Sequence, residues 1–302
     1  MINHGNDNSV DGSNNMLIAD NWAEYRILDS GDGEKIENWN GYTLRRPDPQ
    51  VIWPWRISEN AREDVHGYYH RSKSGGGEWE YRKNTPPYWK ISYKDLTFRI
   101  EPTGFKHTGL FPEQAVNWDW MTEKIKSAER PISVLNLFAY TGGATVACLA
   151  AGASVCHVDA SKGMVAWAKE NVRLSGLSDK PARFIVEDCL KFVQREIRRG
   201  KFYDAIIMDP PSYGRGPNGE LWKLEDELFS LVDVLKDALS DNPLFFLLNS
   251  YTSGFSSQVS ANILSLAVKR NFGGIVSHGE VGLPIAETGL VLPCGTFARW
   301  EK

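Results

Sequence analysis

The feature of this sequence that most constrains its fold is a regular alternation of short apolar segments and amphipathic segments after residue 130. The alternation predicts a mostly parallel β-sheet covered by helices on both faces, an α/β architecture. In such sheets ligands bind beyond the carboxyl ends of the strands. The expected strands are 133–138, 154–158, 182–186, 203–208 and 244–248, with two more near 274–279 and 295–300, and the expected helices are 112–129, 142–151, 161–175, 190–199, 220–239 and 253–269.

The sequence before residue 110 has a different pattern. Its short apolar segments are separated by turn residues, such as 30–33, and by a loop at 72–77. This pattern is typical of a small, mostly antiparallel β domain. Eight of the eleven tryptophans precede residue 121, and they can either fill a small core or form a stacking surface for bases. We expect a disordered polar tail over 1–19, a β-rich domain over 20–109 that could bind substrate, and an α/β domain over 110–302. The expected N-terminal strands are 25–28, 42–44, 51–53, 79–81, 89–93 and 96–100.

Composition narrows the possible partners. The formal net charge is −4, so a nucleic acid would have to be met by a local basic patch. The four cysteines form no CxxC pair and the histidines offer no third metal ligand, so we expect reduced thiols and no metal site. No apolar run reaches the roughly 18 residues that span a bilayer, and the first residues do not resemble a signal peptide. We therefore expect a cytoplasmic protein without a membrane partner.

Chemically distinctive residues follow four successive predicted strands. Gly142 and Gly143 come after the first and allow a tight backbone turn at a helix N-terminus. Asp159 follows the second strand and can accept hydrogen bonds from ribose hydroxyls. Asp188 follows the third and can accept one from an amino group such as that of adenine. The fourth is followed by Asp209-Pro210-Pro211, a rigid turn whose carbonyls we expect to be free of local partners.

Each of these residues has a plain structural alternative. The glycines could form only a turn, Asp159 and Asp188 could cap helices, and the prolines could simply end a strand. One ligand containing a ribose and an adenine would explain three of the four features together. A nucleotide-binding oxidoreductase would instead need G-x-G-x-x-G after the first strand, which this chain lacks.

The combination resembles the class I S-adenosylmethionine-dependent methyltransferases, and more closely the RlmI-like and RlmK-like family of large-subunit ribosomal RNA methyltransferases. The matching segments are 137–143, 158–161, Asp188, 209–211 and 107–114. The resemblance implies a Rossmann-like sheet of seven strands, mostly parallel with the last antiparallel, and S-adenosylmethionine as the cofactor. It also makes 110–302 the methyltransferase domain.

Roles for individual residues follow from the resemblance. The first loop would line the methionine and ribose of the cofactor, Asp159 would bind the ribose, and Asp188 and Cys189 would meet the adenine. Asp209 and Pro210 would lie beside the transferred methyl group and the target base, and segment 107–114 would help close the cofactor site. The expected cofactor-binding residues are Phe138, Tyr140, Thr141, Gly142, Gly143, Asp159, Ala160, Ser161, Asp188, Cys189 and Gln114, and the expected catalytic residues are Asp209, Pro210, Pro211 and Tyr213.

The sequence also departs from the family. No PUA module is recognisable before residue 95, and the end of the fifth strand carries Ser250 and Tyr251 where C5-cytosine methylation would need a cysteine nucleophile. We therefore expect methyl transfer to a nitrogen of an RNA base, with Tyr213 stacking on that base. The alternatives are a protein or small-molecule substrate, C5 methylation with Cys294 as a remote nucleophile, and a noncatalytic RNA-binding protein.

One segment offers a surface for RNA. Residues 82–106 contain six basic residues against two acidic ones, with aromatic residues between them. Cations can hold phosphates while aromatic rings stack on bases; the alternative is a solvated face of ordinary elements. A second basic cluster lies at 195–201. The expected substrate-binding residues are Lys90, Lys94, Arg99 and Lys106.

Overall fold

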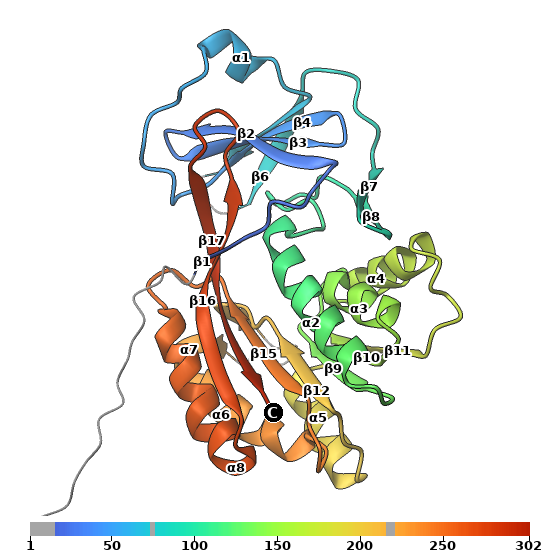
Figure 1. Ribbon diagram of the computed structural model, residues 1–302. Helices are drawn as coiled ribbons and strands as arrows, with labels where there is room; N and C mark the ends of the chain where they lie inside the picture. The colour runs from blue at the N-terminus through green and yellow to red at the C-terminus, as the bar shows by residue number, and fades with distance from the viewer. Residues whose placement is uncertain (1–15, 73–75, 216–220) are drawn as a thin grey trace, which may run out of the picture.

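The computed structural model describes residues 16–72, 76–215 and 221–302. Its largest element is an eight-stranded sheet in the order β1-β16-β17-β15-β12-β9-β10-β11 (Figure 1). Every neighbouring pair is parallel except those that involve β17, which runs antiparallel to β15 and β16. The strands are β1 (Met16–Ile18), β9 (Ser133–Leu137), β10 (Ser154–Asp159), β11 (Ala182–Val186), β12 (Ala205–Met208), β15 (Phe245–Ser250), β16 (Ile275–Pro284) and β17 (Val291–Glu301).

Helices cover both faces of this sheet (Figure 1). Alternate residues of one strand show why: Ala205 and Ile207 of β12 pack into one hydrophobic cluster, and Ile206 and Met208 pack into the other. A strand buried on both faces needs a continuous apolar run. The helices on the first face are α2 (Ala115–Ser127), α3 (Gly143–Ala150) and α4 (Lys162–Leu174), and the short turn η1 (Pro112–Gln114) precedes α2. The helices on the second face are α5 (Cys189–Arg198), α6 (Leu224–Leu235) and α7 (Ser257–Leu264). The turn η2 (Lys236–Ala238) extends α6, and residues 265–269 connect α7 to α8 (Arg270–Phe272).

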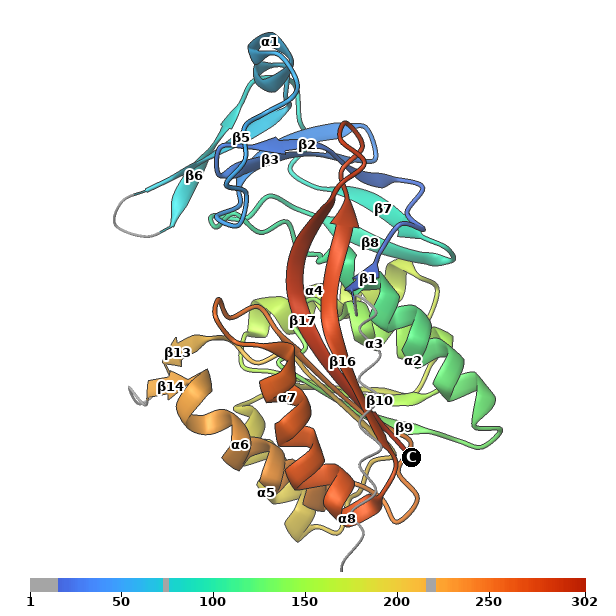
Figure 2. The same cartoon turned by 60° about the vertical axis from the view of Figure 1, so that its left-hand side comes forward.

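The N-terminal part forms a five-stranded sheet in the order β2-β3-β4-β5-β6 and a separate hairpin of β7 and β8. The long hairpin of β16 and β17 rises from the large sheet to meet it (Figure 2). At its tip, the Ala286 and Glu287 amides each donate to a β2 carbonyl at 3.0 Å. The elements are β2 (Tyr25–Gly31), β3 (Glu34–Trp39), β4 (Tyr42–Pro47), α1 (Glu59–Glu63), β5 (Gly67–Arg71), β6 (Gly77–Tyr81), β7 (Trp89–Tyr93) and β8 (Leu96–Ile100).

The expected fold class is confirmed: a large, mostly parallel sheet with one antiparallel strand follows a β-rich N-terminal part. Buried Trp39, Trp89 and Trp118 belong to one continuous hydrophobic cluster, so core packing accounts for much of the N-terminal tryptophan content. The domain boundary at residue 110 stays a prediction, since that cluster extends across it.

Several local expectations were wrong. The large sheet has eight strands, because the apolar residues Met16–Ile18 at the end of the expected tail pair with β16; residues 1–15 and part of the loop at 72–77 lie outside the described residues. Segment 51–53 is not a strand, because its carbonyls accept hydrogen bonds from the turn at Asp32 and Gly33. Strands β3 and β5 were not expected. The helix expected from 220 begins at 224, after the hairpin of β13 (Tyr213–Arg215) and β14 (Leu221–Lys223), and the helix expected from 253 begins at 257.

Candidate active site

The loop between β9 and α3 is shaped for close approach of a ligand. Phe138 and Tyr140 both have a φ of 51°, and Gly142, the N-cap of α3, has a φ of 80°. A Cβ on Gly142 would lie 2.9 Å from the Ala168 Cβ, and one on Gly143 would lie 2.8 Å from the Trp118 ring. Packing therefore requires both glycines, and the backbone conformation additionally requires Gly142.

Two backbone amides hold the side chain of Asp159, at the end of β10. Its carboxylate accepts hydrogen bonds from the Tyr140 amide at 2.9 Å and the Ser161 amide at 2.8 Å. The side chain is only half-buried, so each oxygen keeps a lone pair for a ligand hydroxyl. Ser161 caps α4 through the Met164 amide, and Ala160 and Ser161 are exposed.

Asp188 and Cys189 follow β11 and differ in their burial and in their contacts. Asp188 is the N-cap of α5, where one carboxylate oxygen accepts from the Lys191 amide at 2.9 Å, and its side chain is exposed. Helix capping and contact with an adenine amino group are thus compatible. Cys189 is buried, and its sulfur lies 3.4 Å from the Phe138 amide. This side chain therefore packs against the loop between β9 and α3.

The ends of β9, β12 and β15 border a cleft, whereas Asp159, Asp188 and Cys189 do not line it. The lining residues come from the segment before η1, from the first loop and from the ends of β12 and β15. A larger hollow lies between the N-terminal sheet, α1 and the tip of the β16–β17 hairpin, but it contains none of the strand-end residues. We place the site at the strand ends because the chemical groups converge there. The cleft is lined by Leu110, Phe111, Gln114, Trp118, Asn136, Phe138, Ala139, Tyr140, Thr141, Gly143, Ala144, Ile207, Asp209 and Asn249.

Asp209 brings a carboxyl group with an altered pKa into this cleft. Burial, and then the nearby carboxylate of Glu113, raise the pKa of Asp209 to about 7. Burial also raises the pKa of Glu113. The Asp209 carboxyl group can therefore hold a proton near neutral pH.

The two prolines that follow are not equivalent. Pro210 is buried, whereas Pro211 is exposed and its carbonyl accepts a hydrogen bond from Trp222 Nε1 at 2.6 Å. The Pro211 carbonyl therefore has a partner, although not a local one, because β14 folds back and supplies the donor from 11 residues further along. The Trp222 ring lies 5.9 Å from the Phe138 ring, so the same side chain joins the proline turn to the first loop.

An aromatic wall, formed by Phe111, Tyr140 and Tyr251, lies beside Asp209. The Phe111 ring is 5.6 Å from that of Tyr140 and 5.3 Å from that of Tyr251. The Tyr251 hydroxyl accepts from Gln114 Nε2 at 2.7 Å. Asn249 lies near the end of β15 and Tyr251 follows that strand directly, so the strand-end rule could have found both, whereas Trp222 carried no local signal.

A buried hydrogen-bonded network holds Gln114 in place. Asn117 Nδ2 donates to Gln114 Oε1 at 2.8 Å and to Asn249 Oδ1 at 3.1 Å. Arg299 of β17 donates to Asn117 Oδ1 through Nε at 3.0 Å and Nη2 at 2.6 Å. Gln114, expected to bind the cofactor, is thus also the link between η1 and the aromatic wall.

Some expected residues are not brought to the cleft. Tyr213, in β13, is 53% exposed and does not line it. Lys90 and Arg99 are cross-strand partners in the β7–β8 hairpin, and Arg99 pairs with Glu101. Lys94 pairs with Asp119 at 2.6 Å. Lys106 lies apart from them, so the four expected substrate-binding cations do not form one surface.

Cys294 approaches the site from β17. It occupies a bulge, since Val281 pairs with Gly295 and Gly282 with Pro293. A Cβ on Gly295 would come 2.9 Å from the Tyr251 ring, which shows how closely this strand passes the aromatic wall. Burial, and then the Glu113 carboxylate, raise the pKa of the Cys294 thiol well above its usual value. A thiol held in its neutral form is a poor nucleophile.

Among the described residues, no group of three or more His, Cys, Asp or Glu side chains is arranged to hold a metal ion. Within the same part of the chain, no helix combines the length and apolar character needed to cross a membrane.

Fold and site together define a Rossmann-like methyltransferase. A family model described as S-adenosylmethionine-dependent methyltransferase matches residues 42–225, more than half of the chain, and the chain belongs to this family. The Gly-rich loop, the fixed Asp159 and the exposed Asp188 fit the methionine, ribose and adenine of S-adenosylmethionine, the cofactor of the family.

Individual relatives narrow the comparison. A ribosomal RNA large subunit methyltransferase K/L from Shewanella sp. (strain MR-4) is 33% identical over 175 residues, which cover 54% of this chain and 24% of the relative. The chain thus matches only about a quarter of the length of that curated relative. A crystal structure of an S-adenosylmethionine-dependent methyltransferase from Agrobacterium tumefaciens is 37% identical, with a TM-score of 0.90 over 95% of this chain and 93% of that one.

A more distant solved structure agrees on the fold. SMU.776, a methyltransferase solved with S-adenosylhomocysteine, is 18% identical, with a TM-score of 0.70 over 93% of this chain and 76% of that one.

Proposed function

We propose that this chain is a cytoplasmic methyltransferase that transfers the methyl group of S-adenosylmethionine to a nitrogen atom of a nucleobase in ribosomal RNA. The observation that carries the proposal is the position of Asp209: its carboxyl group lines the same cleft as the cofactor loop and the aromatic ring of Phe111. A planar base can stack on such a ring while a carboxyl group accepts its N–H hydrogen bond. The names of the curated relatives support RNA as the substrate class.

The cofactor would be held by residues at three strand ends. Asp159 would accept hydrogen bonds from the ribose hydroxyls, and Asp188 would accept one from the adenine amino group. The first loop, at Phe138, Tyr140 and Gly142, would lie against the methionine and ribose. When bound, the cofactor supplies an activated methyl group on a positively charged sulfur.

Asp209 would orient the acceptor and take up its proton. Methylation of an N–H nitrogen forms an N–C bond, breaks the S–C bond and releases one proton from nitrogen. A carboxyl group with a pKa of about 7 is suited to accept that proton near neutral pH. Holding the nitrogen lone pair in line with the methyl group supplies much of the rate by itself.

C5 methylation of cytosine with Cys294 as the nucleophile is the second candidate. The bulge at Cys294 and the closeness of β17 to Tyr251 favour it. The raised pKa of this thiol argues against it, because thiolate attack on the base must come first. Nitrogen transfer needs no such nucleophile.

Mass spectrometry of nucleosides from cells with and without the protein tests the proposal. We expect one N-methylated nucleoside to disappear from ribosomal RNA when the protein is absent. Loss of 5-methylcytidine would contradict the nitrogen assignment. Unchanged RNA, together with a methylated protein or metabolite that depends on the chain, would contradict the substrate class.

A further inference from the structure

The two faces of the β5–β6 pair differ sharply in chemistry. Tyr69 pairs with Trp79 and His70 with Glu78 across the two strands. Because side chains alternate along a strand, Tyr69, Arg71, Trp79 and Tyr81 share one face, and Tyr68, His70, Glu78 and Glu80 share the other.

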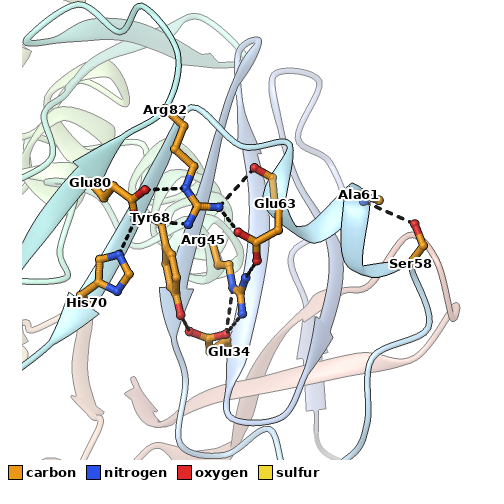
Figure 3. A network of polar contacts seen from close by, with 9 residues as sticks. All are labelled: Glu34, Arg45, Ser58, Ala61, Glu63, Tyr68, His70, Glu80 and Arg82. Carbon is orange, nitrogen blue, oxygen red and sulfur yellow. Dashed lines mark hydrogen bonds and ion pairs between the residues drawn. The ribbon is translucent and has the colours of Figure 1, made fainter.

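Side chains of the second face take part in a network of ion pairs (Figure 3). Glu80 contacts His70 at 2.7 Å and Arg82 at 2.9 Å. Glu63 pairs with Arg82 and, at 2.7 Å, with Arg45. Arg45 in turn contacts Glu34 at 2.6 Å, and the Tyr68 hydroxyl donates to Glu34 at 2.8 Å. Most of the acidic groups around this pair of strands are therefore neutralised on the face away from Trp79.

The first face is extended by the segment after β8. Trp79 Nε1 donates to the Thr103 carbonyl at 2.7 Å, and the Tyr69 hydroxyl donates to the Gly104 carbonyl at 3.4 Å. Two large aromatic side chains remain open to solvent here, Tyr81 at 51% and Phe105 at 66% exposure. We call Arg71, Tyr81, Phe105 and Lys106 the basic–aromatic face.

The charges on the basic–aromatic face are not neutralised. Burial, and then repulsion by cations that include Lys35, Arg46 and Arg71, lower the pKa of Lys106, and Asp48 offsets only part of this effect. Lys35 and Arg46 are already occupied by the Glu37 and Asp48 carboxylates. Over the described ranges of the chain, no carboxylate lies within ion-pair distance of Arg71 or Lys106.

The basic–aromatic face leads to the methyl-transfer cleft. His107 follows Lys106 directly, and its ring lies 5.6 Å from that of Phe111, which lines the cleft. The carbonyl of Lys106 also accepts a hydrogen bond from Arg46 at 2.7 Å, so the segment is anchored to the N-terminal sheet.

We propose that the basic–aromatic face binds single-stranded RNA and directs the target nucleotide toward the cleft. Exposed rings stack on unpaired bases, and unneutralised cations hold the adjoining phosphates, which is the combination that single strands require. The identity of the nucleic acid rests on the proposed function. The proposal also replaces the expected cations Lys90, Lys94 and Arg99, and keeps Lys106 and Phe105 of the expected segment 82–106.

Fluorescence anisotropy of a labelled 12-nucleotide single-stranded RNA with the full chain tests this. We expect Phe105→Ala and Lys106→Gln each to weaken binding by about fivefold or more, in line with the loss of a stacked base or a phosphate contact. For the double variant Arg71→Gln/Lys106→Gln, the slope of log affinity against log salt should become shallower by about 1.4, since each phosphate contact to a single strand contributes about 0.7.

Two matched controls sharpen the test. Lys94→Gln removes a cation that is already paired with Asp119, and Phe202→Ala removes an aromatic ring that is 52% exposed, before β12. Both should bind the RNA within twofold of wild type. Thermal stabilisation by S-adenosylhomocysteine, unchanged in all variants, would show that each is folded.

Failure of the inference can be told from failure of the proposed function. If the 12-mer binds with the expected pattern but no RNA is methylated, the basic–aromatic face stands and the proposed function falls. If RNA is methylated but Phe105→Ala and Lys106→Gln bind and turn over like wild type, the inference is overturned. Equal binding of duplex and single-stranded RNA, or equal losses in the control variants, would also overturn it.

Discussion

Asp159 is oriented by the backbone of two separate segments, which makes its proposed role in cofactor binding testable. Asp159→Ala should weaken S-adenosylhomocysteine binding by about 1–3 kcal/mol, the usual loss for a hydrogen bond to a charged group. Calorimetry of the folded variant measures this. Asp159→Asn is the matched control, because it keeps one acceptor oxygen and should lose less. Unchanged affinity in Asp159→Ala would remove this residue from the site.

The raised pKa of Asp209 has a consequence for stability. Burial and Glu113 keep its carboxyl group protonated in the folded chain up to about pH 7, whereas the unfolded chain ionises near pH 4. Folding therefore binds a proton between these values, and stability from this group is lost as pH rises through 7.

Asp209→Asn should remove the loss of stability that ionisation of Asp209 causes as pH rises. We expect the melting temperature of the variant, relative to wild type, to be higher at pH 8 than at pH 5. Thermal unfolding of both proteins without cofactor measures the difference. If the difference in melting temperature between the two proteins does not change with pH, Asp209 has an ordinary pKa.

Glu37 and Arg46 form a buried ion pair between β3 and β4. Burial alone would raise the pKa of Glu37, but the charges of Arg46 and Lys35 outweigh it and lower this pKa to about 2. Such a depressed pKa contributes stability above the unfolded value near 4.3, and this stability is lost as pH falls through 2.

Glu37→Gln should destabilise the protein by about 3–5 kcal/mol at pH 7, because it leaves a buried arginine without its partner. Urea unfolding at pH 7 measures the loss, and the difference from wild type should narrow at pH 3. A difference that does not depend on pH would show that packing, and not charge, is responsible.

Buried ion pairs also explain why some strands were missed in the sequence. Strand β3 carries Glu37 pointing inward, where a simple pattern expects an apolar residue, and ion pairs with Arg46 and Lys35 make that burial possible. The central strands β9, β10, β12 and β15 were predicted because burial on both faces makes their sequences continuously apolar.

Part of the candidate site could also be predicted from the sequence. Phe138 and Asp209, directly after β9 and β12, line the cleft, whereas Asp159 and Asp188, at the ends of β10 and β11, do not. The Trp222 contact with Pro211 could not be predicted, because it depends on a hairpin that returns to the site from 11 residues further along. Likewise, no local pattern separates the ion-paired Lys94 from the unpaired Lys106.

One hydrophobic cluster joins the N-terminal sheet to one face of the large sheet. Ile27 and Trp39 of the N-terminal sheet, Leu283 of the β16–β17 hairpin and Val134 of the large sheet all belong to it. We therefore expect a single cooperative unfolding transition in calorimetry. Two separated transitions, with only the second shifted by S-adenosylhomocysteine, would show that the N-terminal part folds independently.

The proposed methyl transfer to a base nitrogen through Asp209 can be tested by mass spectrometry of RNA nucleosides after reaction with S-adenosylmethionine that carries a deuterated methyl group. Wild type and Cys294→Ala should place the label on a base nitrogen at rates within a few-fold of each other. Asp209→Ala should bind the cofactor normally and lose turnover, since its contact tightens as the nitrogen meets the methyl group. Label at C5 of cytosine, abolished by Cys294→Ala and retained by Asp209→Ala, would contradict the account.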